Sequence, residues 1–208
     1  MSTAISIGWN CESAILGIKK GLRQPKKKGY KTCVFDLMVS NYPGIILCLQ
    51  DDFYDFLNTA YITTKVIGGE IIIYHTKYNF WFNHESPGHA DLYKLQKWKN
   101  GKYHFVNNNF KKFVERYRER IENFRNYIYS GKHIQFIIER FNSNYKDDIP
   151  ELITVIKRKY PHLRFDFIFV PHLYNSSHTI EYIRTHLIEM GFTENDEEIK
   201  RLNYTNKC

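Results

Sequence analysis

Strand-like apolar runs alternate with amphipathic helical segments along the chain, and this alternation limits the folds open to it. In the second half, the strand-like run 133–141 is followed by a helical segment at 149–160 and by another strand-like run at 164–170. Such alternation is typical of parallel sheets, because a crossover must carry the chain back before the next strand begins. We therefore predict an α/β fold: a single domain over 1–208 with a mostly parallel, Rossmann-like sheet and helices on both faces.

The remaining elements follow from periodicity and from turn residues. The most strongly patterned helix is predicted at 110–129, where an apolar residue recurs every three or four positions. The charged residues on that helix predict a solvated face with paired charges, from which an arginine could also reach the site. The other predicted elements are a strand at 4–8, a helix from 11 to about 22, a strand or extended segment at 33–39, a helix at 42–57, a β-hairpin insertion near 68–84, a loop with a short helix at 85–104, a helix at 179–190 and a loosely packed charged tail at 192–208.

Composition supports a globular chain that needs no covalent staples. The 208 residues are 43% hydrophobic and 16% aromatic, which is enough to bury a sizeable core. The cysteines are far apart and form no C-x-x-C pair, and the N-terminus shows no signal-peptide pattern. No apolar run approaches the roughly 20 residues of a membrane span. We therefore expect a soluble, cytoplasmic protein with free thiols and no membrane span, and the sequence does not indicate its oligomeric state.

The net charge of +8 raises the question of a nucleic-acid partner. The densest basic cluster is "PKKKGYK", residues 25–31. However, the chain is rich in Lys, Asn, Ile, Tyr and Phe, the residues that AT-rich codons supply, so we do not favour nucleic acid. A basic loop of this kind can still attract an acidic or phosphorylated ligand.

Chemically active side chains follow the predicted strands. Because ligands of open α/β sheets bind at the carboxyl ends of the strands, these residues form the candidate site. Cys11, at the start of a helix, would have its thiolate stabilised by the helix dipole, and His84 would serve as its base. Asp36, Glu85 and Asn83 are all candidates for orienting that imidazole. The residues expected to line the substrate pocket are Gly8, Trp9, Asn10, Asn83, Glu85, Arg140 and Asn142.

Several alternatives stay open beside this interpretation. Cys11 can equally be a small packing residue at a strand-helix joint. "HESPGHAD", residues 84–91, offers metal ligands, but its spacing matches no closed zinc pattern, so we expect neither a metal nor another cofactor. A glycosyltransferase could bind a nucleotide sugar at a basic edge near Arg140, although no D-x-D motif is present. A non-catalytic binding module could use the basic loop 25–31.

Several short motifs, in order, resemble a domain-of-unknown-function family described as papain-like cysteine peptidases. The first is Ser-x-Gly-x-Asn-Cys at Ser6, Gly8, Asn10 and Cys11. The others are Leu22-Arg23, Phe35-Asp36, Phe82-x-His84, Tyr117-Arg118-x-Arg120-Ile121 and the strand 136–140, so the resemblance extends over about residues 5–170. Leu37 and Glu85 stand where the family pattern usually has Trp and Asp.

The resemblance implies Cys11 as nucleophile, His84 as base and Asp36 as acidic partner. The chain would then be a cysteine hydrolase or acyltransferase that acts on a peptide, acyl or glycan-linked substrate. A papain-like architecture also implies that the cysteine is on a helix and the histidine on an antiparallel sheet. The periodicity of the second half instead predicts parallel strands.

Overall fold

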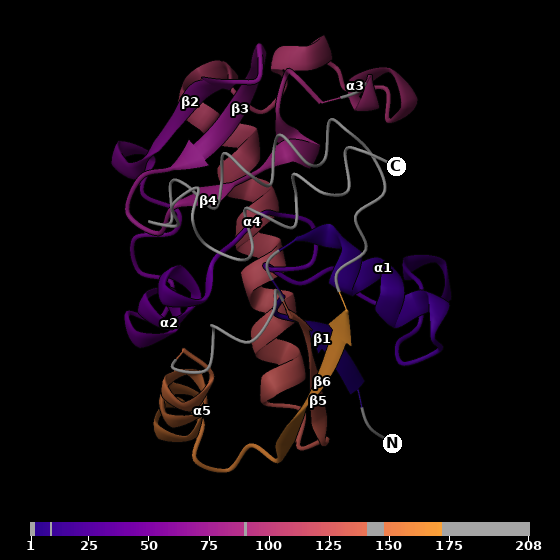
Figure 1. Cartoon of the computed structure of the whole chain (residues 1–208). Coiled ribbons are helices and arrows are strands. Elements are labelled where there is room, and N and C mark those ends of the chain that lie inside the picture. The colour runs from indigo at the N-terminus through magenta and orange to yellow at the C-terminus, as the bar shows by residue number, and fades with distance from the viewer. Residues whose placement is uncertain (1–2, 9, 90, 141–147, 172–208) are drawn as a thin grey trace, which may run out of the picture.

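The structure is a computed structural model that describes residues 3–8, 10–89, 91–140 and 148–171 (Figure 1). These residues form two three-stranded sheets. The parallel sheet has the order β1-β5-β6, with bounds Thr3–Ser6, Ile134–Arg140 and Phe165–Pro171. The antiparallel sheet has the order β2-β3-β4, with bounds Ile62–Ile67, Glu70–His75 and Phe80–Trp81.

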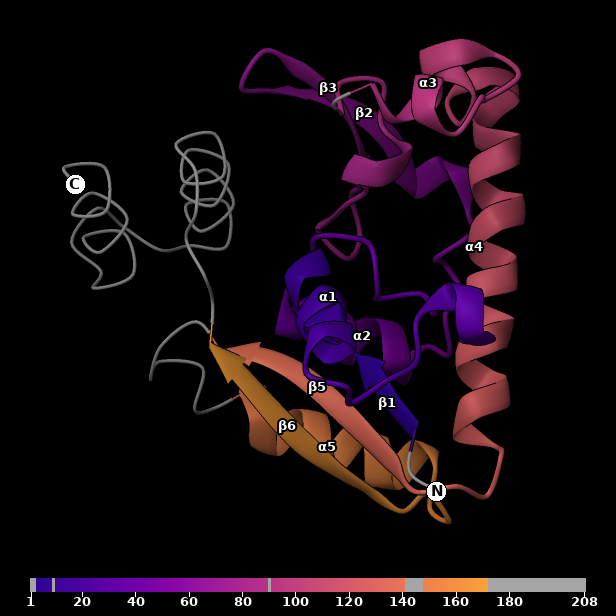
Figure 2. The same cartoon turned by 90° about the vertical axis from the view of Figure 1, so that its right-hand side faces the viewer.

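Helices cover both faces of the parallel sheet, as the sequence predicts. Side chains alternate between the faces of a strand, so Ile137 packs with Ala4 on the side of α1 (Cys11–Lys19), while Phe136 and Ile138 join the larger core. That larger core also holds the apolar side chains of α5 (Asp148–Lys159). In Figure 2, α1 and α5 accordingly lie on opposite sides of the sheet.

The antiparallel sheet corrects the prediction of a mostly parallel fold, because half of the strands in the described ranges are antiparallel. Antiparallel pairing within 68–84 is present as β3 and β4. Strand β2 was missed, although Gly68 and Gly69 marked its turn: their φ values of 56° and 81° suit a two-residue hairpin that only glycine enters easily. The Rossmann-like detail stays a prediction, since three parallel strands do not establish it.

Two predicted elements in the first half differ from the structure. Within the predicted strand or extended segment 33–39, residues 34–37 form turns, because the Asp36 carboxylate accepts the Cys33 N–H at 2.7 Å. Val39 forms an isolated bridge to Trp81. The helix predicted at 42–57 is shorter: α2 spans Tyr42–Gln50, with its proline in the first turn as expected. Positive φ values at Asp52 and Phe53 do not fit a right-handed helix, and residues 51–57 are turns.

Helix α1 leaves two of its apolar residues largely exposed while it buries its small ones. Ile15 and Ile18 are 43% and 37% exposed, whereas Ser13, Ala14 and Gly17 are buried. A Cβ atom on Gly17 would lie 2.4 Å from the Cδ1 atom of Ile137. The small residues therefore allow the helix to lie close against β5, and this close packing outweighs burial of the isoleucines.

Helix α4 (Asn107–Ile128) confirms the most strongly patterned prediction, with Phe113, Tyr117, Ile121, Phe124 and Ile128 all buried. The loop before it contains the short helix α3 (Leu92–Leu95), also as predicted. One hydrophobic cluster includes residues from both sheets and from α2, α4 and α5. The predicted helix 179–190 and tail 192–208 lie outside the described residues.

Candidate active site

Cys11 is the first residue of α1, at a joint that three hydrogen bonds hold in place. The Asn10 side chain caps the helix, with its Oδ1 atom 2.7 Å from the Glu12 N–H. The Ser13 hydroxyl donates to the Asn10 carbonyl at 2.9 Å, and the Ser6 hydroxyl lies 2.5 Å from that of Ser13. Since the Ser13 proton is already used, Ser6 is the donor in this contact. Cys11 itself is half-buried and is not in a disulfide.

His84 lies in the 3-10 turn Asn83–Glu85, which follows strand β4. The last residue of this turn, Glu85, fixes its position. The Glu85 carboxylate is fully buried, with Oε1 3.0 Å from both Arg116 and Arg120 and Oε2 accepting the Tyr117 hydroxyl at 3.1 Å. Three side chains of one helix therefore anchor the turn that carries His84.

The segment Val39–Ser40 connects the Cys11 joint to the His84 turn. On one side, the Ser40 hydroxyl lies 3.5 Å from the Gly8 carbonyl, three residues before Cys11. On the other side, Val39 and Trp81 exchange two backbone hydrogen bonds of 2.8 Å, three residues before His84. The two candidate catalytic residues thus follow chain segments that are both bonded to one dipeptide.

A cleft of about 680 Å³ lies beside His84. Its walls come from the loop 26–32, the His84 turn and helix α4. It is predominantly cationic: Lys26, Lys31, Arg116 and Arg120 line it together with the carboxylates Glu85 and Glu119. Cys11 is not one of its lining residues.

The environment of His84 favours a neutral imidazole. Burial lowers the pKa of His84 below its ordinary value, the Glu85 charge opposes this effect, and His89, Arg120 and Arg116 add to it. The His89 ring lies 5.1 Å from that of His84, centroid to centroid. A neutral imidazole near pH 7 can accept a proton, as a general base must.

The Asp36 carboxylate is bonded to groups that hold the chain near residues 23–36. This buried carboxylate accepts the Arg23 Nη1 at 2.6 Å, the Tyr30 hydroxyl at 3.0 Å and the Cys33 N–H at 2.7 Å. None of these donors is a histidine. A catalytic role for Asp36 stays a prediction, and of the three candidates for orienting His84 only Glu85 and Asn83 share its turn.

The other predicted site residues are distributed around these elements. Gly8 and Asn10 are buried beside Cys11, and Asn83 is half-buried in the His84 turn. Arg140 ends strand β5, and Trp9 and Asn142 lie outside the described residues. In the described ranges no group of three or more His, Cys, Asp or Glu side chains is arranged to hold a metal ion. The same ranges contain no helix with both the length and the apolar character of a membrane span.

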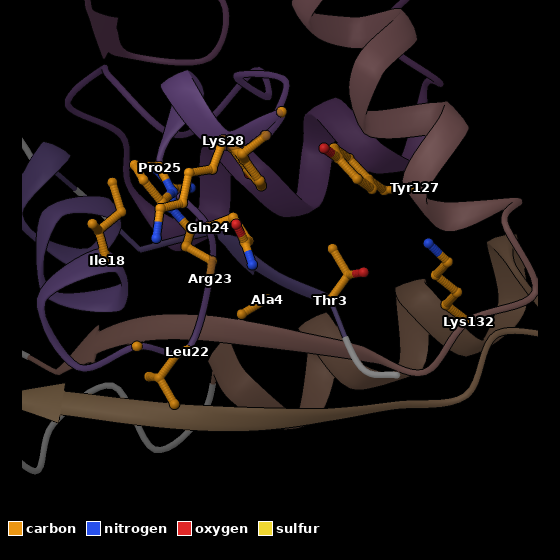
Figure 3. Close-up of a pocket in the computed structure, with 13 residues that line it drawn as sticks. Thr3, Ala4, Ile18, Leu22, Arg23, Gln24, Pro25, Lys28, Tyr127 and Lys132 are labelled. Carbon is orange, nitrogen blue, oxygen red and sulfur yellow. The ribbon is translucent and has the colours of Figure 1, made fainter.

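A second cleft, of about 750 Å³, lies at the amino-terminal edge of the parallel sheet, where Thr3 begins β1. Figure 3 shows Arg23 and Lys28 on the loop side of this cleft and Tyr127 and Lys132 across from them. Its lining contains no carboxylate. The basic loop predicted at 25–31 therefore separates two clefts, and Gly29 and Tyr30 line both.

Residues 2–175 match the model of a domain-of-unknown-function family whose description is "Putative papain-like cysteine peptidase". The chain belongs to this family. No curated protein and no solved structure matches the chain.

The motif residues that resemble this family have identifiable structural roles in the chain. The Ser-x-Gly-x-Asn-Cys motif builds the joint that presents Cys11, and Tyr117 and Arg120 hold the turn that presents His84. Cys11 begins a helix and His84 follows an antiparallel sheet, the arrangement that the papain-like description implies.

The sequence predicts a solvated face on α4 and leaves open that an arginine of this helix reaches the site. In the structure, Arg120 is only 7% exposed, and both Arg116 and Arg120 contact Glu85 in the His84 turn. The available signal was the four-residue spacing of the two arginines around Tyr117, which places all three near one face of a helix.

Proposed function

We propose that this protein is a cysteine hydrolase or acyltransferase in which Cys11 is the nucleophile and His84 is the general base. The observation that carries the proposal is the pair of contacts through Val39–Ser40, which ties the Cys11 joint to the His84 turn. The family description supports the same class of reaction.

In the proposed reaction, His84 accepts the Cys11 thiol proton and the sulfur attacks the substrate carbonyl carbon. The carbonyl π electrons move to oxygen, and their return expels the leaving group, which takes the proton from the imidazolium. Water, or another acceptor in the transferase case, then gives its proton to His84 and attacks the thioester carbon. The carbon–sulfur bond breaks and the thiol is restored. Because α1 begins at Cys11, the positive end of this helix would stabilise the negative charge that develops beside the sulfur in both steps.

The test is the rate of iodoacetamide alkylation at each cysteine of the folded protein as a function of pH, measured by peptide mass spectrometry. Cys33 and Cys48 are internal controls: both are fully buried, and burial raises the pKa of each thiol well above its ordinary value. We expect Cys11 to react while these two do not, with a midpoint below that of a free thiol. His84→Ala should slow the reaction. Cys11 reacting only on unfolding would overturn the proposal.

The cleft at the amino-terminal edge supports a second candidate, a non-catalytic module that binds an acidic partner. Lys28 and Lys132 line it without any carboxylate, and the Arg23 guanidinium lies 4.2 Å from the centre of the Tyr30 ring. Binding of an acidic peptide that weakens steeply with salt and survives Cys11→Ala would favour this candidate.

A further inference from the structure

One of the arginines that line the cleft beside His84 has a buried nitrogen that donates no hydrogen bond within the described residues. Arg120 is 7% exposed, and within the described part of the chain its Nη1 atom has no hydrogen-bond partner. An unsatisfied buried donor is unfavourable, and more so when the group is charged. An acceptor brought by a ligand would remove this cost.

Arg120 is held in position before any ligand arrives. Its Nη2 atom lies 3.0 Å from Glu85, and the guanidinium carbon lies 4.7 Å from the centre of the Tyr117 ring. Tyr117 is itself fully buried and bonded to Glu85. The guanidinium plane is therefore fixed on two sides, which reduces the entropy lost when a ligand binds.

The charge around Arg120 favours an anion. Glu85, one of the two carboxylates of the cleft, is already shared by Arg116 and Arg120, and Glu119 is exposed on α4. Lys26 and Lys31 add positive charge from the facing loop. Because Nη2 is already bonded to Glu85, Arg120 offers an incoming anion the single donor Nη1, and a carboxylate of a peptide can accept that bond through one oxygen while its charge is shared with the lysines.

We propose that this cleft binds a carboxylate side chain of a peptide substrate, with Arg120 Nη1 as the principal donor and Lys31 and Lys26 as supporting cations. This inference rests on the proposed function, because it assigns a substrate class to the site beside His84. The substrate of the thiol would then be a peptide with an acidic residue near the scissile bond.

The first experiment titrates the protein with N-acetyl-glutamate amide and with its neutral counterpart N-acetyl-glutamine amide, following the imidazole resonances of His84 by NMR. We expect a saturable shift with the glutamate probe and at least about fivefold weaker binding of the glutamine probe.

The lysines of the facing loop are tested in the same titration. Lys31→Gln and Lys26→Gln should each weaken the binding of the glutamate probe. Lys27→Gln is the matched control, because it removes the same charge from the same loop but does not line the cleft. Equal binding of both probes, no saturable shift, or equal weakening by Lys27→Gln would overturn the inference.

The second experiment separates this inference from the proposed function. The rates of alkylation at Cys11 by iodoacetate and by iodoacetamide are compared, with glutathione as the reference thiol. We expect the iodoacetate preference at Cys11 to exceed that of glutathione by about fivefold and to fall in Lys31→Gln. If Cys11 reacts with neither reagent but the NMR titration succeeds, the carboxylate site stands and the nucleophile fails. If Cys11 reacts rapidly without charge preference and the titration fails, the nucleophile stands and the carboxylate site fails.

Discussion

The Glu85 carboxylate lies 3.0 Å from the Nη2 atom of Arg120, with both residues buried between the His84 turn and helix α4. A buried ion pair adds little net stability, because removing both charges from water is costly. Removing only one partner is strongly destabilising, because the other charge is then left buried without compensation. The site therefore depends on a polar contact that is also part of the folded core.

Glu85→Gln should lower the free energy of unfolding by about 3 kcal/mol, because it leaves Arg116 and Arg120 without their counterion. Urea denaturation at about pH 7 measures the loss. Glu122→Gln, at an exposed position of the same helix, is the control and should change stability by less than about 0.5 kcal/mol. An equally small effect of Glu85→Gln would show that the pair does not anchor the turn.

Cys11→Ala should abolish activity and remove the labelled Cys11 peptide while changing the free energy of unfolding by less than about 1 kcal/mol, since the side chain is only half-buried. Thermal unfolding of both proteins provides the comparison. Cys48→Ala is the contrasting variant, because its side chain is fully buried and its loss leaves a cavity. A destabilisation by Cys11→Ala as large as that of Cys48→Ala would support a packing role for Cys11.

Gly44→Ala should destabilise the protein by about 3 kcal/mol, because the new Cβ would lie 2.2 Å from the Tyr78 carbonyl oxygen, a backbone atom that cannot move alone. Gly17→Ala brings a Cβ to 2.4 Å from Ile137, but there the neighbour is the end of a side chain that can rotate. We expect the second loss to be clearly smaller when both are measured by urea denaturation. The reverse order would contradict the close approach of α2 to the β3–β4 turn.

His75 should make stability fall with acidity. Its ring is fully buried, with Nε2 3.1 Å from the Asp55 carbonyl, and burial lowers its pKa to about 4 from the ordinary 6.5. The unfolded chain therefore binds more protons between these values, so stability is fully present above about pH 6.5 and is lost as the pH falls toward 4. The His75 contribution between pH 6.5 and about pH 5 is about 2 kcal/mol.

Urea denaturation across that pH range, for the wild type and for His75→Gln, measures this contribution. The glutamine keeps an amide donor and acceptor but does not titrate, so the variant should show the smaller dependence on pH. Parallel pH profiles for the two proteins would mean that His75 does not titrate below its ordinary pKa on folding.

The parts of the fold that sequence predicted correctly are those where one local pattern determines the outcome. The stripe of α4 and the apolar runs of β1, β5 and β6 are of this kind. The failures arise where other contacts override the apolar pattern. The Asp36 carboxylate, bonded to the Cys33 N–H, closes the turns at 34–37, and the close packing of Gly17 against Ile137 leaves Ile15 exposed.

The candidate site divides in the same way. A cysteine at the start of a helix is visible in the sequence because capping by Asn10 is a local contact. The Glu85–Arg120 contact that anchors the His84 turn joins residues 35 positions apart, and nothing in the local pattern of either segment determines it. The resemblance to the family gave the order of these motifs, and the structure adds the contact between them.

The shared hydrophobic cluster has a consequence for how the molecule unfolds. Because Ile5 of the parallel sheet and Ile73 of the antiparallel sheet belong to one cluster, neither sheet can expose its apolar face without opening the core of the other. The two sheets should therefore behave as one cooperative unit, and the slowest-exchanging amides of β1 and β3 should share a single opening free energy in native-state hydrogen exchange.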